Sequence, residues 1–312
     1  MVDLKDISKK DRLIMGVSGG ADSVFLLLYL FKRGYKNLII AHVNHQTRGK
    51  ENEKDAIFVH NLSKKLNLPF EEIIIEKHKK GNAEDYFRNK RYEFFEELRQ
   101  KYKANWIITA HHLNDNIETI LLNFTRGANI SGLTGIHFKD ENRHIIRPLL
   151  NISRDEIEKQ LKNWKQKFRV DSSNYNIDHS RNRIRQNVIP ELKKINPNLE
   201  KTLKENIENL KETANFIKNK TDSWIKTNYK NNQFEINKFL NQALTIQNSI
   251  LSRIFKKIHG NTNKFNQNHL KQIRKILEQN ISNKKKEFGP GHFIEIRKDK
   301  DAKVARISLK NK

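Results

Sequence analysis

Cysteine is absent from the 312-residue sequence. The chain therefore cannot form disulfides, bind metals through thiolates or relay sulfur through a cysteine. Long apolar runs are also missing, since none approaches the roughly 20 residues that span a bilayer. The first residues, MVDLKDISKKDR, are charged and do not have the apolar segment of a signal peptide. We therefore expect a cytoplasmic protein that does not bind a membrane.

Acidic residues are scarce relative to basic ones. The sequence has 61 Lys and Arg but 36 Asp and Glu, which gives a formal net charge of +25. Residues 201–312 hold 25 of the basic and 10 of the acidic residues, so the surplus is concentrated there. A positive field of this size attracts polyanions, above all nucleic acid. The alternative is that a composition rich in Lys, Asn and Ile simply makes the solvated surfaces basic.

Apolar runs alternate with helical patterns in the first half of the sequence. Strands are predicted over residues 12–17, 37–45, 69–75 and 105–112. Helices are predicted near residues 22–33, 51–66, 82–102 (with Asn82 as its cap) and 153–164, and one more follows the fourth strand. This alternation indicates an α/β fold, a doubly wound parallel sheet with helices on both faces.

The pattern changes after the segment INPNLE at residues 195–200. Apolar residues at spacings of three and four then predict an amphipathic helix from Leu199 to Ile217. Further helices are predicted at 241–258 and 268–279, and two alternating runs around a polar turn at 293–309 predict a hairpin. We therefore expect two domains, residues 1–200 and 201–312. The second should be small, mostly helical and basic, and should end in the hairpin.

The stretch SGGADS, residues 18–23, joins the first predicted strand to the first predicted helix. Gly19 and Gly20 let the backbone approach a ligand closely, and a helix N-terminus attracts anions. Neither the Lys of a kinase-type loop nor a G-x-G-x-x-G fingerprint is present. Asp22 would repel phosphates by itself, but it fits if a magnesium ion lies between them. Otherwise the stretch is a Gly-rich turn in which Asp22 caps the helix.

His111, Asp115 and Glu118 fall at i, i+4 and i+7 of a helix that we expect to begin at residue 111, and hence on one face. Two carboxylates at the mouth of a parallel sheet suit a cationic amine, a magnesium ion, or both. One alternative is a strand-end histidine whose partners are backbone groups. Another is a divalent-metal hydrolase, because His111 and Asp115 have metal-ligand spacing.

Arginines cluster in the run R-N-R-I-R at residues 181–185, which lies between the two predicted domains. A run of this kind is usually a solvated face. In this position it could instead contact an RNA backbone or a developing adenylate. Arg88 and Arg91 are three apart on the third predicted helix, so they share a face and could join the same cleft.

Several motifs together carry a resemblance to a known family. S-G-G-x-D-S at 18–23 resembles the phosphate loop of the N-type ATP pyrophosphatases. Three further stretches resemble tRNA(Ile)-lysidine synthetases, namely H-V-N-H-x-x-R-G at 42–49, R-x-x-R-Y at 88–92 and H-H-x-x-D-x-x-E-T at 111–119. The resemblance covers residues 12 to about 200, and beyond it only the basic, helical character matches. Thr47, Asn114 and Asn116 depart from the family's usual residues.

The resemblance implies an ATP-dependent ligase that attaches lysine to carbon 2 of the wobble cytidine in the CAU-anticodon isoleucine tRNA. An adenylated tRNA would be the intermediate, and AMP and pyrophosphate would be released. It implies a catalytic domain at 1–200 with an adenine nucleotide hydrolase-like fold, followed by a tRNA-binding domain. ATP and magnesium would be required, and tRNA and free lysine would be the partners. The oligomeric state stays open, a homodimer included.

The resemblance also assigns roles to residues. The ATP phosphates would contact Ser18, Gly19, Gly20, Ala21, Asp22 and Ser23, with Asp22 sharing the magnesium ion. Adenine would contact the backbone of Ala41, His42 and Val43. The lysine and reaction site would be lined by His111, Asp115 and Glu118, with Asp115 as the favoured base. The adenylate or the lysine carboxylate would be held by Arg91 and Arg183.

Three other functions compete with this interpretation. A tRNA thiolase would share the loop and the basic domain, but it normally needs cysteines. An amidotransferase-type synthetase for a small nucleotide would not need so basic a second domain. An RNA-binding protein that only senses ATP would not need Asp115 and Glu118 on the face of a cleft.

Overall fold

The computed structural model describes residues 2–46, 49–76, 83–169, 180–259, 265–279, 281, 284–289, 291–299 and 302–309. Arg48 of the H-V-N-H-x-x-R-G motif, the variant Thr47 and the expected cap Asn82 lie outside these ranges. The chain forms two compact units, Met1–Leu210 and Lys211–Lys312. The division between the units, after Leu210, falls within helix α9 (Leu199–Asn228), whereas the sequence interpretation placed it after residue 200.

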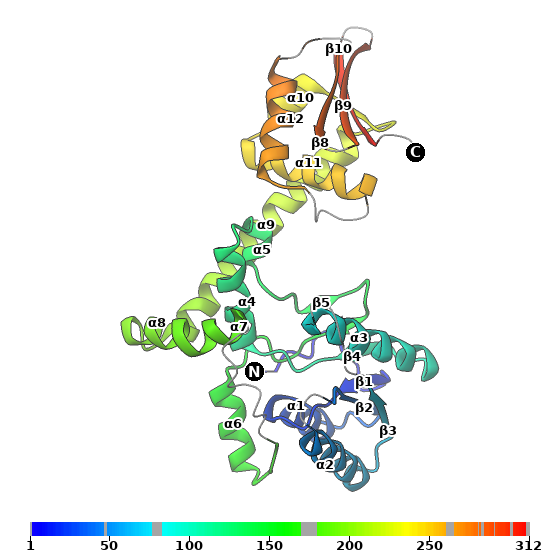
Figure 1. The fold of residues 1–312 in the computed structure, drawn as a ribbon, viewed down its shortest axis with the longest axis vertical. Helices are drawn as coiled ribbons and strands as arrows, with labels where there is room; N and C mark the ends of the chain where they lie inside the picture. The colour runs from blue at the N-terminus through cyan, green and yellow to red at the C-terminus, as the bar shows by residue number, and fades with distance from the viewer. Residues whose placement is uncertain are drawn as a thin grey trace. The chain divides into compact units, whose positions relative to one another are not determined.

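A six-stranded sheet is the centre of the first unit (Figure 1). Its strands are, in spatial order, β3 (Phe70–Ile74), β2 (Leu38–Asn44), β1 (Leu13–Gly16), β4 (Trp106–Ile108), β6 (Ile145–Ile146) and β5 (Lys139–Asp140). All neighbouring pairs are parallel except β5 with β6, which is antiparallel. The sheet is therefore parallel apart from one edge strand.

Helices cover both faces of this sheet because successive side chains of each strand point to opposite sides. Leu13 and Met15 belong to one core with α1 (Ala21–Lys32), α2 (Lys50–Leu66) and α6 (Arg154–Asn163). Ile14, between them, belongs to a second core with α3 (Ala83–Lys101). Figure 1 shows α1 and α2 on one face and α3 on the other. The doubly wound α/β fold predicted from sequence is confirmed.

The order of the strands reverses between β1 and β4. From β1 the chain proceeds outward through β2 and β3, and it then returns to place β4 on the other side of β1. At such a switch point the connections leave adjacent strands in opposite directions, which opens a crevice at their carboxyl ends. The segments after β1 and after β4 therefore meet at this crevice, and they contain residues 18–23 and 111–118.

A small helical layer follows β4. It contains α4 (Leu113–Thr125), α5 (Ile130–Leu133), α7 (Ser180–Arg183), a π-helical turn (Ile184–Val188), α8 (Ile189–Ile195) and the first part of α9. Leu113 and Ile117 of α4 pack with Ile184, Ile189 and Ile207 in a separate core. This core fixes the arginine run of residues 181–185 beside α4.

The second unit contains a four-stranded antiparallel sheet with helices. The strands, in spatial order, are β7 (Gln233–Glu235), β10 (Ala302–Leu309), β9 (His292–Asp299) and β8 (Lys284–Gly289). The helices are the end of α9, α10 (Ile236–Leu240), α11 (Leu244–His259) and α12 (Gln267–Gln279). The hairpin predicted at 293–309 is β9 with β10. The outer strands β7 and β8 were not predicted. No helix in the described parts of either unit has the length and apolar character to cross a membrane.

Candidate active site

The loop after β1 is shaped to receive an anion. Gly19 has a φ of +92°, a conformation that residues other than glycine rarely adopt. Ser18 donates its backbone N–H to the Ser23 hydroxyl over 3.2 Å, and that hydroxyl lies 3.1 Å from the carbonyl oxygen of Gly20, to which it donates. No side chain caps α1, whose first residue is Ala21. The first backbone N–H groups of α1 therefore have no intrahelical acceptor and are available to phosphate oxygens.

Arg169 ties this loop to α2. Its backbone N–H donates to the carbonyl oxygen of Gly19 at 2.9 Å. Its guanidinium donates to Asp55 at 2.8 Å and to Glu51 at 2.6 Å. Asp55 is buried, so its charge needs a partner of this kind. The motifs did not point to Arg169, because its partners are more than a hundred residues away in the sequence.

The three residues expected beside adenine lie on β2, next to the loop. Val17 donates its backbone N–H to the carbonyl oxygen of Ala41 at 2.9 Å. The Nδ1 atom of His42 lies 2.8 Å from the carbonyl oxygen of Val17, and His42 is buried. Val43 follows, half-buried, toward the carboxyl end of the strand. Their backbone is thus held against the start of the phosphate loop, while their contact with adenine stays a prediction.

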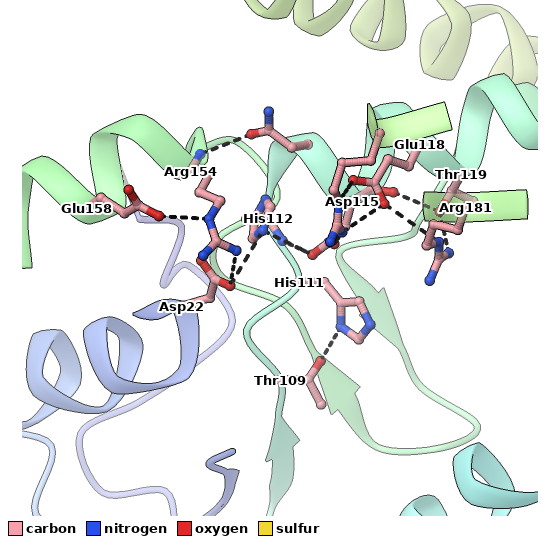
Figure 2. A network of polar contacts seen from close by, with 12 residues as sticks. Asp22, Thr109, His111, His112, Asp115, Glu118, Thr119, Arg154, Glu158 and Arg181 are labelled. Carbon is pink, nitrogen blue, oxygen red and sulfur yellow. Dashed lines mark hydrogen bonds and ion pairs between the residues drawn. The ribbon is translucent and has the colours of Figure 1, made fainter. Parts of the chain in front are cut away.

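His112 connects the two halves of the crevice, as Figure 2 shows. Its Nε2 atom lies 3.6 Å from Asp22 and 3.5 Å from Asp115. Its backbone N–H also donates to Asp115 at 3.0 Å, and it is the N-cap residue of α4. Only 3% of His112 is exposed. The carboxylate of the phosphate loop and the carboxylate of α4 therefore face the same buried imidazole.

His111 does not lie on the helix with Asp115 and Glu118, which corrects the expectation from sequence. Helix α4 begins at Leu113 because His112 and Asp115 form its cap, so His111 belongs to the connection from β4. Its Nδ1 atom lies 3.0 Å from the Thr109 hydroxyl.

The charge state of His111 follows from its surroundings. Burial lowers the pKa of His111 to about 4, the nearby Asp115 opposes this, and Arg147, Arg91 and Arg88 lower it further. A histidine with this pKa is neutral near pH 7. Arg91 lies on α3, and its contact with the adenylate or the lysine carboxylate stays a prediction.

Asp115 and Glu118 carry opposite pKa shifts although both are on α4. Burial acts to raise the pKa of Asp115, but His112, His111 and the backbone N–H of His112 outweigh it and hold the pKa below the usual range. Burial raises the pKa of Glu118, and Arg185 only partly offsets this. Asp115 is therefore ionised near pH 7 and can accept a proton.

Two guanidiniums of the arginine run face these carboxylates. Arg185 donates to both oxygens of Glu118, at 2.6 and 3.0 Å, and lies 3.7 Å from Asp115. Arg181 lies 3.8 Å from Glu118 and donates to the Thr119 hydroxyl at 3.0 Å (Figure 2). Arg183, which the resemblance assigns to the adenylate or the lysine carboxylate, is exposed, and its contact with either stays a prediction. The spacing of four between Arg181 and Arg185 was the available signal, because such residues share a helix face.

Asp22 has a carboxylate oxygen that is available to bind a magnesium ion. One of its oxygens lies 3.5 Å from Arg154, whose side chain also pairs with Glu158 at 2.8 Å. Its other oxygen is buried and has no hydrogen-bond partner in the described part of the chain. Burial raises the pKa of Asp22, while His112 and Arg154 lower it. Among the described residues, no group of three or more acidic or histidine side chains is close enough together to hold a metal ion. An ion at Asp22 would complete its coordination with phosphate oxygens and water, as magnesium usually does.

Known proteins resemble this chain in sequence and in fold. The tRNA(Ile)-lysidine synthase of Porphyromonas gingivalis strain W83 is 40% identical over 223 residues, which cover 70% of this chain and 49% of that protein. The tRNA(Ile)-lysidine synthase of Clostridioides difficile strain 630 is 32% identical over 309 residues, 94% of this chain and 66% of that protein. The solved U34-tRNA thiolase NcsA from Methanococcus maripaludis has a TM-score of 0.53 and 19% identity, with 65% of this chain and 72% of that chain covered.

These comparisons confirm the resemblance that the motifs carry. The chain spans about half to two thirds of the length of the two synthases, 49% and 66%. The likeness to the thiolase, at 19% identity, shows the fold alone. The model of the PP-loop domain, an ATP-utilising domain, matches residues 2–192. Because this match covers more than half of the sequence, the chain belongs to the PP-loop domain family.

Proposed function

We propose that this chain ligates lysine to carbon 2 of the wobble cytidine in the CAU-anticodon isoleucine tRNA, at the expense of ATP. The observation that carries the proposal is the buried His112, which lies within 3.6 Å of Asp22 in the phosphate loop and of Asp115 on α4. An ATP-binding loop and an ionised acidic group thus meet at one crevice. The similarity to two tRNA(Ile)-lysidine synthases supports the same reaction.

In the first step, the carbonyl oxygen at carbon 2 of the cytosine attacks the α-phosphorus of ATP, and pyrophosphate leaves. The amide groups at the start of α1 hold the phosphates, and Gly19 gives them access. A magnesium ion bound by Asp22 would offset phosphate charge during this step. Arg154, 3.5 Å from Asp22, adds a positive charge at the same place. Adenylation matters because a ring carbonyl oxygen is a poor leaving group and AMP is a good one.

In the second step, the ε-amine of lysine attacks carbon 2 and AMP leaves. The amine must lose a proton, and Asp115 is our proposed acceptor because its pKa is held low and its carboxylate is ionised. Glu118 is held in place by Arg185, which donates to both of its carboxylate oxygens and balances its charge. Arg91 and Arg183 remain the proposed contacts for the adenylate or the lysine carboxylate.

The remaining assignments follow from the same proposal. Residues 1–200 would form the catalytic domain, and residues 201–312 would grip the tRNA mainly through phosphates. Lysine and tRNA would be the partners, and the cytoplasm the location. A thiolase with a similar fold is disfavoured, because this chain has no cysteine to carry sulfur. An RNA-binding protein that only senses ATP would have no use for an ionised Asp115 in the crevice.

The reaction can be tested with purified protein, Mg·ATP and radiolabelled lysine. The CAU isoleucine tRNA is the substrate, and the initiator methionine tRNA with the same anticodon is the control. We expect AMP and labelled tRNA only with the isoleucine tRNA. Formation of AMP without incorporation of lysine would support the adenylation step and would refute lysine as the nucleophile. No ATP cleavage with either tRNA would refute the proposal in favour of an RNA-binding function.

Asp115→Asn tests the proposed base. This change keeps the size of the side chain and removes its ability to accept a proton, so lysine transfer should fall by about 10²–10⁴-fold. The affinity for tRNA, measured by filter binding, should stay within about twofold because Asp115 lies at the ATP crevice. Asp155→Asn, at an exposed position on α6, is the matched control. Full turnover in Asp115→Asn would remove the residue from the mechanism.

A further inference from the structure

A pocket of about 390 Å³ lies in the second unit, between the end of α9 and the later half of α11. Its lining consists of Ile225, Tyr229, Arg253, Ile254, Lys256 and Lys257. The volume is in the range that holds a small organic group rather than a helix or a duplex. Its wall combines apolar, phenolic and cationic side chains, which is the mixture that an anionic ligand with an apolar part requires.

Tyr229 has a donor group that the protein itself does not use. The residue is 8% exposed, and its hydroxyl is buried without a hydrogen-bond partner in the described residues. A buried hydroxyl without a hydrogen-bond partner destabilises the protein, and a ligand acceptor would remove this cost. Burial also raises the pKa of Tyr229, although Arg306 opposes this, so the hydroxyl stays protonated and can donate.

The cations of the pocket are not equally free. Arg253 is held by Asp222 through three contacts of 2.7, 2.9 and 3.1 Å, which balance its charge and fix its position. Lys257 lies over the Tyr229 ring, with Nζ 5.4 Å from the ring centroid. Neither Lys256 nor Lys257 pairs with a carboxylate in the described part of the chain. Two positive charges without a carboxylate partner therefore line the pocket and favour an anion.

We propose that this pocket binds one nucleotide of the tRNA. The phosphate would lie at Lys256 and Lys257, the sugar or base would pack against Ile225 and Ile254, and the Tyr229 hydroxyl would donate to the ligand. The inference rests on the proposed function, because it takes an RNA to be the substrate. The pocket offers two cations, an apolar surface and one hydroxyl donor. These features match the phosphate, sugar and base of one nucleotide better than they match a carboxylate side chain. A free mononucleotide presents the same chemistry, and the experiment separates the two.

The first test removes the two lysines from the full-length chain. Lys256→Ala/Lys257→Ala should weaken tRNA binding by about tenfold or more at low salt and reduce the salt slope, since two phosphate-directed charges are lost. The matched control is Lys271→Ala/Lys275→Ala, which removes two exposed lysines of α12 outside the pocket. The control should change the affinity by less than about threefold. Equal losses in the two pairs would mean a diffuse positive field and would overturn the pocket.

The second test is Tyr229→Phe, which removes only the hydroxyl. If this hydroxyl donates to RNA, tRNA affinity should fall about three- to tenfold, while the stability of the free protein stays equal or rises. A loss of stability with unchanged affinity would show an internal partner and overturn the proposal. Added AMP separates the two sources of nucleotide. If AMP binds wild type but not the lysine pair variant, and tRNA affinity is the same in both, the pocket takes a free nucleotide and the RNA assignment is wrong.

Failure of this inference can be distinguished from failure of the proposed function. Lysine transfer by wild type together with unaltered tRNA binding in all pocket variants would refute the pocket alone. Tight tRNA binding by wild type without any ATP cleavage would refute the ligase, while a selective loss of binding in the pocket variants would still support the site.

Discussion

At the scale of single residues, His111 and His112 are neighbours with different environments. His112 is enclosed by carboxylates of two segments, Asp22 and Asp115. His111 faces the guanidiniums of Arg147 and Arg91, which disfavour its charged form. The two histidines therefore have different roles at the crevice. His112 links the acidic groups, and His111 is a neutral ring that can form hydrogen bonds.

The neutrality of His111 has a consequence for stability. Its pKa is about 4 in the folded chain against an ordinary 6.5, so between these values the unfolded chain binds more protons. Protonation of His111 should therefore lower the free energy of unfolding of wild type by up to about 3 kcal/mol as the pH falls from 6.5 to about 4. The free energy of unfolding of His111→Gln should fall less between pH 7 and pH 4.5, as measured by urea unfolding at both pH values. The exposed His60→Gln is the control, and an identical pH dependence in all three proteins would contradict the assignment.

Sequence reasoning found most of the residues of the site but not their arrangement. The motif placed His111, Asp115 and Glu118 within eight residues, yet the start of α4 decided which histidine joins the carboxylates. Helix boundaries depend on caps, and the cap of α4 is the contact between His112 and Asp115. The sequence alone does not tell whether His111 or His112 makes this contact. In the same way, the choice between Arg183 and Arg185 depends on the phase of a short helix that ends in a π-helical turn.

At the scale of elements, the contact of Arg169 with α2 holds the phosphate loop. Arg169→Met would remove the guanidinium contacts with Asp55 and Glu51, while the backbone N–H of residue 169 could still donate to Gly19. We expect a loss of about 1–3 kcal/mol in the free energy of unfolding, because the buried Asp55 loses a charged hydrogen-bond donor while the partly exposed Arg169 does not make a fully buried pair. The KM for ATP should also rise. Urea unfolding and the dependence of AMP formation on ATP measure the two effects.

Lys54 provides the control for this element, because it pairs with the same Glu51 from an exposed position. Lys54→Met should leave both the free energy of unfolding and the KM for ATP nearly unchanged, because an exposed ion pair contributes little to stability. Similar losses in both variants would mean that Arg169 contributes only surface charge.

Elements with strong periodicity were the ones that sequence reasoning located. Strands β1 and β2 are largely apolar runs because both of their faces are covered, and α1 follows the loop after β1 directly. Strand β8 reads KKKEFG, so nothing in its composition marks it as a strand. It forms because β9 offers an edge to which its backbone can bond. Strand β7, with three residues, is similarly defined by its partner β10.

At the scale of the whole molecule, the charge sets how binding responds to salt. With a net charge of +25, and 25 basic against 10 acidic residues at 201–312, tRNA binding should be dominated by release of counterions. Contact with six to ten phosphates would reduce affinity by about 10³–10⁵-fold between 50 and 200 mM salt. Filter binding across this range measures the slope, and ATP binding without tRNA is the comparison. A flat salt response would show that the basic surface does not contact RNA.

The anchoring of the phosphate loop by Arg169 also bears on how the protein is made. The loop begins at residue 18, but the arginine that fixes it is separated by 114 residues from Asp55 and by 118 from Glu51. Contacts of such long range form late, since the intervening chain must be closed into a loop first. A chain still emerging from the ribosome can therefore assemble β1, α1 and β2 before its nucleotide site is rigid. The contact that anchors the phosphate loop can form only after residue 169 has been synthesised.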